Sequence, residues 1–427
     1  MGDDSPLAEA QALAARAWGA RRTWFLTGGA SQANRVGALA LGGLGGPEQP
    51  VIVQRSAHSS FIDGIILSGI LPVFLQPTVD TSFGMAHGVS VASLKRTLSE
   101  TKDAKGVYLV SPSYFGAVSD VSALARVAHD AGVPLMVDAA WGAHFGFHPD
   151  LPQNPVVLGA DLVVSSTHKL GGSLTQSAML HLGDGPFAAE LEPLIQRAIA
   201  VSQSTSMSSL LLASLDIARH SLENGGERIG ASIAAANQLR SAIRERGRFG
   251  IVSDSWHGDD IVAADPLRVS IDVRRGGLNG HAAQHELIDS AGIYTEISTE
   301  ACIVAFIGPG LEPDSERFLS ALHALDAHGR LAYVEADTLA LPPPGALRIR
   351  PREAWLATSV TLPATAAVGR ISTDSLAAYP PGVPNVLPGE VLTREVVDFL
   401  RHTAASSGGY VRGAVDSAVD QLRVVAG

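Results

Sequence analysis

The chain has little of the material from which disulfides, metal sites and membrane spans are built. Its 427 residues include a single cysteine, Cys302, which excludes an intramolecular disulfide and any zinc site with several cysteines. No apolar run reaches the roughly 18 to 20 residues needed to span a bilayer. The first residues also lack the basic and apolar regions of a secretory signal. These absences predict a cytoplasmic protein.

Charged side chains are also sparse. They make up 17% of the residues, whereas hydrophobic residues make up 46%, so the chain is too apolar for disorder and long enough for a large core with at least one smaller domain. The net charge of −11 argues against nucleic acid or an anionic membrane as the main partner, because both attract basic surfaces. We expect a globular enzyme that acts on a small molecule.

What the chain does have is an alternation of short apolar runs and helical patterns. Such alternation predicts a largely parallel α/β sheet covered by helices on both faces. The strand-like runs are 24–27, 51–53, 72–75, 107–110, 134–137 and 162–164, and helices are predicted over 7–17, 35–41 and 121–131. Catalytic groups then belong at the carboxyl ends of the strands.

The second half of the chain has a different pattern. Long helical segments fill 210–246, with a break near Gly225 and Gly226 and a stop at Gly247, and shorter strands follow at 267–273, 292–297 and 302–307. The proline-rich segments 341–344 and 379–384 are predicted loops. We therefore divide the chain into an N-terminal helix over 1–20, a large domain over 21–260 and a small C-terminal domain over 261–427.

Lys169 and Asp138 are the most informative residues. Lys169 follows the apolar run 162–164, and Asp138 ends another apolar run. A lysine at a strand end can condense with the aldehyde of pyridoxal 5'-phosphate, and a carboxylate at a neighbouring strand end can hold the pyridine nitrogen protonated. The pair predicts a pyridoxal phosphate site.

Two segments are candidates for binding the cofactor phosphate. Ala30, Ser31 and Gln32 open a predicted helix whose free N–H groups favour anions, although Ser31 as an ordinary N-cap is the alternative interpretation. Ser166 and His168 flank the lysine closely enough to reach a phosphate, or they satisfy a strand end.

Three histidines need separate interpretations. His58 follows the run 51–53 and can stack on a pyridine ring, although a lone loop histidine is more often a packing residue. His144 and His148 have the spacing of zinc ligands on a helix, but Gly142 and Gly146 argue against that helix, so we predict no metal site.

At this point the chain resembles the Orn/Lys/Arg decarboxylases, a family of fold-type I pyridoxal phosphate enzymes. The resemblance runs from about Leu7 to the end and depends on ordered motifs. These motifs are 25–34, His58, Ser68-Gly69, 137–145 and 166–170, followed by 351–354, 367–372 and 379–390. The fold it implies is an aspartate aminotransferase-like large domain with a mostly parallel sheet, plus a smaller C-terminal α+β domain.

The resemblance also implies roles for particular residues. Lys169 would carry the cofactor, Asp138 would pair with the pyridinium nitrogen and His58 would stack on the ring. The implied phosphate and ring contacts are Ala30, Ser31, Gln32, Ala140, Ser166 and His168. Thr205 and Ser206 would reach the neighbouring subunit's site, which implies a homodimer or larger homo-oligomer with shared active sites.

The activity that the resemblance implies is decarboxylation of lysine, ornithine or arginine to the amine through an external aldimine, as in polyamine biosynthesis. Lys169 or His168 would return the proton to Cα. Trp141 and Glu390 are candidate substrate contacts, and Glu353 and Glu296 are further acidic candidates. The alternatives are elimination, cyclisation, transamination or oxidation of a specialised amino acid, or a non-catalytic subunit that kept the fold.

The sequence departs from the family pattern at several positions. Relatives usually carry an N-terminal segment with a Pro-Gly-His-Lys pattern, and this sequence is interpreted as a short form without it. The substituted positions are Ser59 for lysine, Thr299 for an acidic residue, Met207 for proline, Ala139 for an acidic residue and Trp141 for histidine. The last two border the cofactor ring, so they bear on the reaction more than on cofactor binding.

Overall fold

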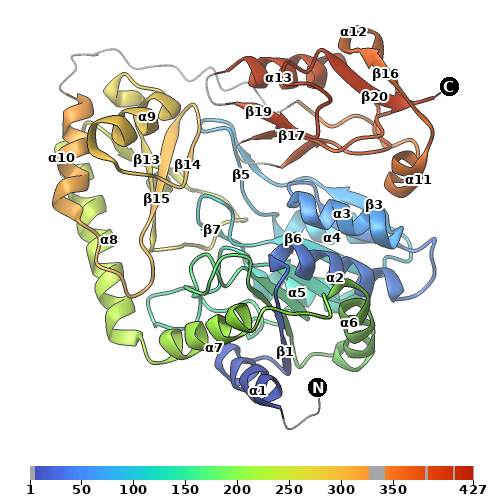
Figure 1. Cartoon of the computed structure of the whole chain (residues 1–427), viewed down its shortest axis with the longest axis horizontal. Helices are drawn as coiled ribbons and strands as arrows, with labels where there is room; N and C mark the ends of the chain where they lie inside the picture. The colour runs from blue at the N-terminus through green and yellow to red at the C-terminus, as the bar shows by residue number, and fades with distance from the viewer. Residues whose placement is uncertain (1–4, 327–341, 380–382, 407–408, 427) are drawn as a thin grey trace.

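A seven-stranded sheet organises the first part of the chain. The computed structural model describes residues 5–326, 342–379, 383–406 and 409–426 (Figure 1). The strand order is β1-β10-β9-β8-β6-β2-β3. The bounds are β1 Arg22–Leu26, β2 Pro50–Gln54, β3 Leu71–Leu75, β6 Gly106–Val110, β8 Leu135–Asp138, β9 Leu162–Ser165 and β10 Ala178–Leu182. Strand β10 runs antiparallel to both its neighbours, whereas the pairs from β9 to β3 are parallel. The predicted mostly parallel α/β sheet is confirmed.

Alternating side chains of these strands build two cores, one on each face. Val51 and Val53 point to the face covered by α2 (Gly29–Gly43), α3 (Ser59–Ser68) and α6 (Ala188–Ser202). Ile52 points to the opposite face, which is covered by α4 (Val91–Glu100) and α5 (Val121–Asp130). The same alternation separates Met136 from its neighbours on β8, because successive side chains of a strand leave opposite faces. Both faces of the sheet are therefore buried, which explains why the strands are nearly continuous apolar runs.

Helices and a second sheet extend the structure beyond the large sheet. Helix α1 (Pro6–Trp18) begins at the N-cap Ser5, and α7 (Ser209–Glu223) and α8 (Gly226–Arg246) meet at the predicted break. Helix α8 ends at Gly247, whose φ of 68° is the left-handed conformation that glycine adopts readily. Among the described residues, no helix is long and apolar enough to cross a membrane.

The second sheet has four antiparallel strands in the order β11-β13-β15-β14. The bounds are β11 Gly250–Ile251, β13 Arg268–Asp272, β14 Ile297–Ser298 and β15 Cys302–Phe306, with α9 (Gly280–Ala291) and α10 (Ser315–Asp326) packed nearby. One apolar cluster joins this sheet to α8, α9 and α10. The strand predicted over 292–297 is shorter than expected and begins only at Ile297. Strands from both sides of Asp260 share this sheet, so the division near that residue stays a prediction.

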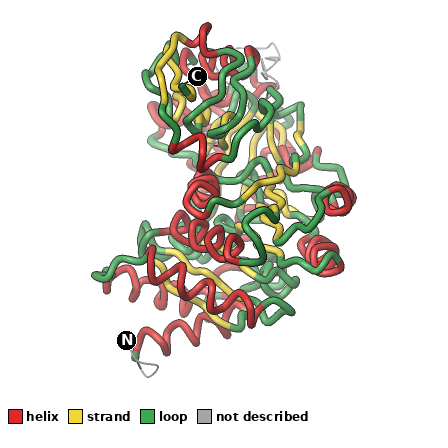
Figure 2. The backbone as a smooth tube through the Cα atoms, turned by 90° about the vertical axis from the view of Figure 1, so that its right-hand side faces the viewer, coloured by secondary structure: helices red, strands yellow, loops and turns green. Residues whose placement is uncertain are grey.

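The residues described after position 341 form a separately cored unit, which we call the C-terminal module. It comprises α11 (Pro351–Leu356), β16 (Ser359–Pro363), α12 (Ala364–Ala367), β17 (Leu376–Tyr379), β18 (Pro384–Val386), α13 (Arg394–Ala405), β19 (Tyr410–Arg412) and β20 (Gln421–Val425). Figures 1 and 2 show it at one end of the molecule, and Figure 1 shows it next to α3 and β3. The predicted loops fall partly outside the described residues, at Leu341 and at 380–382.

Two short strand pairs lie between these parts. Strand β4 (Val79–Asp80) pairs with β5 (Met85–Ala86) in a hairpin after β3. Strand β7 (Ala117–Val118) pairs with β12 (Ala263–Ala264), which ties the loop after β6 to the segment before β13. These pairs place the second sheet beside the carboxyl ends of the large sheet, where the candidate site lies.

Candidate active site

Parallel pairing of β8 with β9 brings Asp138 and Lys169 to one edge of the sheet. Asp138 is the last residue of β8 and lies in register with Val164 on β9. The N–H of Ala139 donates to the carbonyl of Val164 at 2.9 Å, which extends this pairing past the strand end. Lys169 follows four residues after Ser165, which ends β9, in a turn where its N–H donates to the carbonyl of Ser166 at 2.9 Å. Strand topology thus places the two residues in one site.

Three donors point at the carboxylate of Asp138. Its Oδ2 accepts hydrogen bonds from Asn34 Nδ2 at 2.8 Å and from the Tyr108 hydroxyl at 2.9 Å. Its Oδ1 accepts from the N–H of Ala140 at 3.0 Å. The residue is only 3% exposed, so these bonds replace the water that a buried negative charge loses. The site therefore holds a fixed anion.

Tyr108 stays a hydrogen-bond donor to that anion. Its ring is fully buried and stacks on Phe61 with 3.5 Å between ring centroids. Burial, followed by the neighbouring charge of Asp138, raises the pKa of Tyr108 well above its usual value. Neither Tyr108 nor Asn34 was predicted as a functional residue. A polar ring tip within the otherwise apolar run 107–110 is the only local signal for Tyr108.

Lys169 is half-buried, and its amine lies over an aromatic ring. Its Nζ is 3.6 Å from the ring centroid of Trp141, and the guanidinium carbon of Arg268 is 4.2 Å from the same centroid. No ion pair between described residues involves Lys169. Burial lowers the pKa of Lys169 to about 8; the charge of Asp138 opposes this shift, and that of Arg268 adds to it. A large share of the amine is therefore uncharged and nucleophilic at mildly alkaline pH.

His58 is the N-cap of α3 and is joined to Asp138 through two side chains. Its Nδ1 accepts from the N–H of Ser60 at 3.2 Å and lies 2.8 Å from the Ser60 hydroxyl. That hydroxyl accepts in turn from Asn34 Nδ2 at 3.0 Å. Because Nδ1 is an acceptor, the neutral ring carries its proton on Nε2. Burial lowers the pKa of His58, against the charge of Asp138.

The first turn of α2 lies at the carboxyl end of β1 and presents Ala30, Ser31 and Gln32. The N-cap is Gly28, without a side-chain bond, so the interpretation of Ser31 as an N-cap is wrong. Gln32 Oε1 accepts from the N–H of Gly28 at 3.0 Å, and Gln32 Nε2 donates to Gln203 Oε1 at 2.5 Å. The side chain of Gln32 is thereby fixed against its own helix start.

Ser166 and His168 lie on the turn that precedes Lys169. Ser166 is buried, and His168 is half-buried, with Nδ1 donating to the carbonyl of Ser177 at 2.9 Å. The remaining nitrogen, Nε2, is an acceptor in the neutral ring. Burial lowers the pKa of His168, although the bond to Ser177 opposes the shift. The turn therefore holds a hydroxyl and an imidazole beside the lysine.

The remaining predicted contacts lie in different places. Trp141 is buried beside Lys169 and has edge contacts with Tyr114 and Phe306, at 6.0 Å and 6.3 Å between centroids. Thr205 and Ser206 are exposed between α6 and α7, and no described hydrogen bond joins them to Lys169, Asp138 or His58. The chain thus brings Lys169, Asp138 and His58 within reach of one another's charges, whereas no described contact joins Thr205 and Ser206 to them.

The three acidic candidates for substrate contacts also lie in different environments. Glu390 is 1% exposed and is bonded to Arg55 Nη2 at 3.1 Å and to the N–H of Leu387 at 2.8 Å, so its carboxylate is already occupied. Glu353 is exposed on α11, in the C-terminal module. Glu296 is exposed before β14, and its charge raises the pKa of Lys169 against the dominant effect of burial. Only Glu296 therefore combines exposure with an electrostatic effect on the lysine.

His144 and His148 serve separate partners. His144 Nε2 lies 3.1 Å from Asp265 Oδ1 in a fully buried pair, which also neighbours Arg268. His148 Nδ1 instead accepts from the N–H of Asp150 at 3.1 Å. The two rings do not converge on one point.

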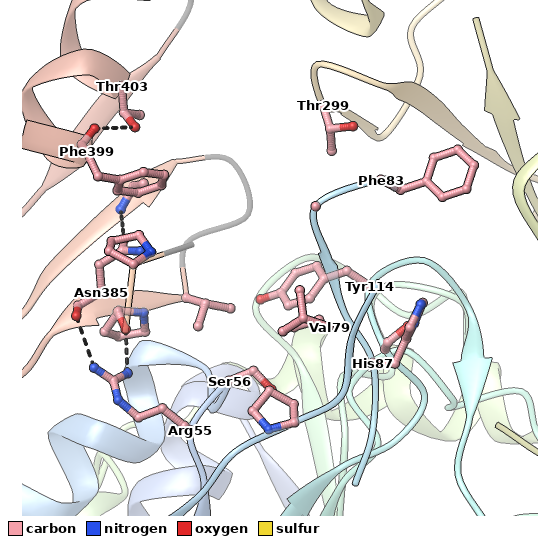
Figure 3. A pocket seen from close by; sticks show the side chains of 18 of the residues that line it. Arg55, Ser56, Val79, Phe83, His87, Tyr114, Thr299, Asn385, Phe399 and Thr403 are labelled. Atoms are coloured by element: carbon pink, nitrogen blue, oxygen red, sulfur yellow. Dashed lines mark hydrogen bonds between the residues drawn. The ribbon is translucent and has the colours of Figure 1, made fainter. Parts of the chain in front are cut away.

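A cavity of about 470 Å³ lies next to this constellation (Figure 3). Its walls come from the loops after β2 and β6, the β4–β5 hairpin, the second sheet and the C-terminal module. Tyr114 belongs to this wall and also contacts the ring of Trp141, over which the amine of Lys169 lies.

The donor set fits pyridoxal phosphate. A lysine amine with a lowered pKa suits an aldehyde, and a buried carboxylate suits a protonated pyridine nitrogen. A helix start with a serine and an imidazole suits a phosphate. A mostly parallel sheet that carries this pair of residues at its strand ends defines the class of fold-type I pyridoxal phosphate enzymes.

Comparisons with known proteins agree with that class and narrow it. The Orn/Lys/Arg decarboxylase major domain matches residues 3–312, and the C-terminal domain of the same family matches residues 345–409. An arginine decarboxylase of Bacillus subtilis is 34% identical over 423 residues, covering 98% of this chain and 85% of that protein. An arginine decarboxylase of Bacillus anthracis is 34% identical over 425 residues, covering 98% and 84%. The chain belongs to the Orn/Lys/Arg decarboxylase family.

Solved structures show the same fold. Lysine decarboxylase A from Pseudomonas aeruginosa has a TM-score of 0.83 at 20% identity, over 99% of this chain and 72% of that one. The constitutive lysine decarboxylase of E. coli has a TM-score of 0.77 at 20% identity, over 99% and 73%. The predicted resemblance and fold class are confirmed, and the protein is a pyridoxal phosphate-dependent amino acid decarboxylase.

The lowered pKa of Lys169 predicts how cofactor attachment depends on pH. Because only the uncharged amine attacks an aldehyde, we expect attachment of pyridoxal phosphate to cofactor-free protein to reach half its full rate near pH 8, well below the lysine's ordinary value of 10.5. The measurement is the growth of the visible Schiff-base band over a pH series. Lys169→Ala should show no band, although the exposed Lys95 and Lys102 remain. A midpoint above pH 10 would contradict the assigned environment.

Proposed function

We propose that this protein decarboxylates a basic amino acid, with lysine, ornithine and arginine as the candidates and pyridoxal phosphate as the cofactor bound at Lys169. The observation that carries the proposal is the placement of a lysine amine with a lowered pKa in the same site as a buried carboxylate that accepts from three donors. Arginine is the first candidate, because the relatives at 34% identity are named arginine decarboxylases.

When bound, pyridoxal phosphate supplies an electron sink for cleavage of a bond at the amino acid's Cα. The residues of this chain arrange that chemistry. Asp138 would hold the proton on the pyridine nitrogen, and Tyr108 and Asn34 orient that carboxylate. His58 would support the cofactor ring, and Lys169 would hold the cofactor through its amine. Lys169 or His168 would supply the proton to Cα of the product.

The phosphate group belongs at the opposite end of the site. Its proposed contacts are the first-turn N–H groups of α2 at Ala30, Ser31 and Gln32, together with Ser166 and His168. The first N–H groups of a helix lack partners within it, which attracts an anion to the start of α2, although the N–H of Gln32 already donates to the carbonyl of Gly28 at 3.3 Å. Helix α2 is held between α3 and α6, so this anchor is rigid.

Recognition of a basic substrate needs negative potential at the entrance. Glu296 is the exposed carboxylate whose charge reaches both Lys169 and Arg268, and it is the proposed partner of the distal amine or guanidinium. The net charge of −11 favours approach of a cation over the whole surface.

The active assembly is proposed to be a homodimer or a higher oligomer with shared sites. Thr205 and Ser206 lie on an exposed segment flanked by Val201, which is 80% exposed, and Leu210, which is 74% exposed. Leu174 is also exposed, and it lies next to α7, since its N–H donates to the hydroxyl of Ser214 at 3.2 Å. Exposed apolar side chains grouped beside an active site favour burial against a second copy.

A substrate panel tests the proposed reaction. The holoenzyme is expected to release CO2 and the matching amine from arginine, lysine or ornithine, and not from amino acids of similar length that lack the distal cation. Detection of both products distinguishes decarboxylation from other chemistry at Cα. Product without CO2, or activity confined to an amino acid outside this set, would refute the proposed reaction and leave the fold unaffected.

Asp138→Asn tests the role of the buried carboxylate. The asparagine keeps the size but loses the charge that holds a proton on the pyridine nitrogen, so we expect kcat to fall by about 10² to 10³, or about 3 to 4 kcal/mol. Tyr108→Phe, which removes one donor, should cost less. An unchanged turnover number in Asp138→Asn, with the cofactor bound, would overturn the assignment.

Leu210→Asp tests the dimer. A charge placed in the exposed apolar group should shift the protein to monomer in light scattering after size exclusion, with loss of decarboxylation. Leu311→Asp is the matched control, since Leu311 is 64% exposed but lies after β15, away from Thr205 and Ser206. A Leu210→Asp protein that keeps the wild-type mass would locate the interface elsewhere.

A further inference from the structure

The C-terminal module contacts the loop that carries His58. Arg55, three residues before His58, donates through Nη1 to the carbonyl of Pro384 at 2.5 Å and through Nη2 to the carbonyl of Asn385 at 3.1 Å. Figure 3 shows Arg55 reaching from the loop after β2 to this strand of the module. Nη2 also donates to Glu390 Oε2 at 3.1 Å. One side chain therefore makes three bonds across the joint.

The ion pair in this joint is buried on both sides. The side chains of Arg55 and Glu390 are 7% and 2% exposed, and Glu390 accepts a further bond from the N–H of Leu387. Burial raises the pKa of Glu390, although the charge of Arg55 opposes the shift. Either partner alone would leave an uncompensated buried charge, so the module can seat only where the two groups meet.

A second contact lies on the other side of His58 in the sequence. Arg412, the last residue of β19, donates through Nη1 to the hydroxyl of Ser59 at 2.9 Å. The module thus holds residues both before and after His58. The ring of His58 is held on the other side by Ser60 on α3, which is joined to Asn34 on α2.

We propose that the C-terminal module is a positioning part of the active site, which fixes the orientation of His58 through Arg55 and Ser59. The inference deepens the proposed function and rests on it in one respect, that His58 lies against the cofactor ring. Arg55, Ser59 and Arg412 are positioning residues, because they act through His58. A small displacement of a group in an active site has large effects, so a distant module can control the site by this route.

The proposal separates the two sides of the His58 loop. The inner connection, through Ser60 and Asn34 to Asp138, sets the tautomer of the ring. The outer connection, through Arg55 and Arg412, sets the path of the backbone on which the ring is mounted. Loss of the outer connection should therefore leave Asp138 and Lys169 in place and change only how the cofactor ring is held.

The buried half of the joint is tested in full-length protein by Arg55→Met/Glu390→Met, which removes both charges together. We expect its Kd for pyridoxal phosphate to rise about tenfold, the size of effect that loss of a supporting partner has at metal sites. The visible circular dichroism of the bound cofactor should weaken as well. Glu390→Gln keeps an acceptor but leaves the buried charge of Arg55 without its counter-charge, so it should weaken both signals as well.

The second contact, between Arg412 and Ser59, is tested in cofactor-free protein by nuclear magnetic resonance of labelled histidine. The charged groups that face His58 are Asp138, Lys169, Arg412 and Asp63, and the positive charge of Arg412 lowers the pKa of the ring in addition to the main effect of burial. Arg412→Met should therefore raise the pKa of His58, whereas Arg412→Lys should keep it low. Arg423→Met is the control, because Arg423 pairs with Asp374 on the same module.

These outcomes are separable from the proposed reaction. If the substrate panel fails but the double variant weakens cofactor binding and Arg412→Met shifts His58, the positioning role stands and the substrate is wrong. If the double variant unfolds, Ser59→Ala removes a single hydroxyl and should still raise Kd. Unchanged Kd, dichroism and His58 resonances in Ser59→Ala and Arg412→Met would overturn the inference.

Discussion

The buried negative charge of Asp138 is the constraint on which the rest of the site depends. A carboxylate that is 3% exposed needs donors to replace lost water, and the chain supplies Tyr108, Asn34 and the N–H of Ala140. Each donor carries a structural consequence. Tyr108 must stay protonated, and Asn34 must turn its amide nitrogen toward Asp138, which also directs that nitrogen to Ser60. The tautomer of His58 is therefore set by the same charge.

Several opposing effects determine the pKa of Lys169, which lies in the same site as Asp138. Burial disfavours the ammonium form, Asp138 favours it, and Arg268 behind Trp141 disfavours it again. Burial prevails, so the amine is available as a nucleophile although a carboxylate lies in the same site. The amine lies over the ring of Trp141, which carries no formal charge. A carboxylate in that place would raise the pKa of Lys169 toward its ordinary value. The substitution of histidine by tryptophan at this position is thus compatible with attachment of a cofactor.

Much of the fold and the core of the site were predictable because they follow from local rules. Apolar runs of strand length between amphipathic helices indicate a parallel sheet, and neighbouring parallel strands end at one edge, which brought Asp138 and Lys169 together. The antiparallel β10 was not predicted, since its run resembles any buried strand. Tyr108 and Asn34 lie 30 and 104 residues from Asp138, and no local pattern connects them. Glu390 was predicted to contact the substrate because it belongs to a family motif. Its partner Arg55 lies 335 residues away, and no local pattern connects the two residues.

That long separation carries a physical meaning. A buried ion pair gains little stability over an apolar contact, but it permits only one relative placement of the two surfaces that carry its charges. Arg55 and Glu390 therefore fix the placement of the C-terminal module against the loop after β2, and the hydrogen bond from Arg412 to Ser59 fixes the same placement at a second point. Because His58 lies between Arg55 and Ser59 in the sequence, the geometry at the cofactor ring depends on a module that contributes none of the strand-end groups.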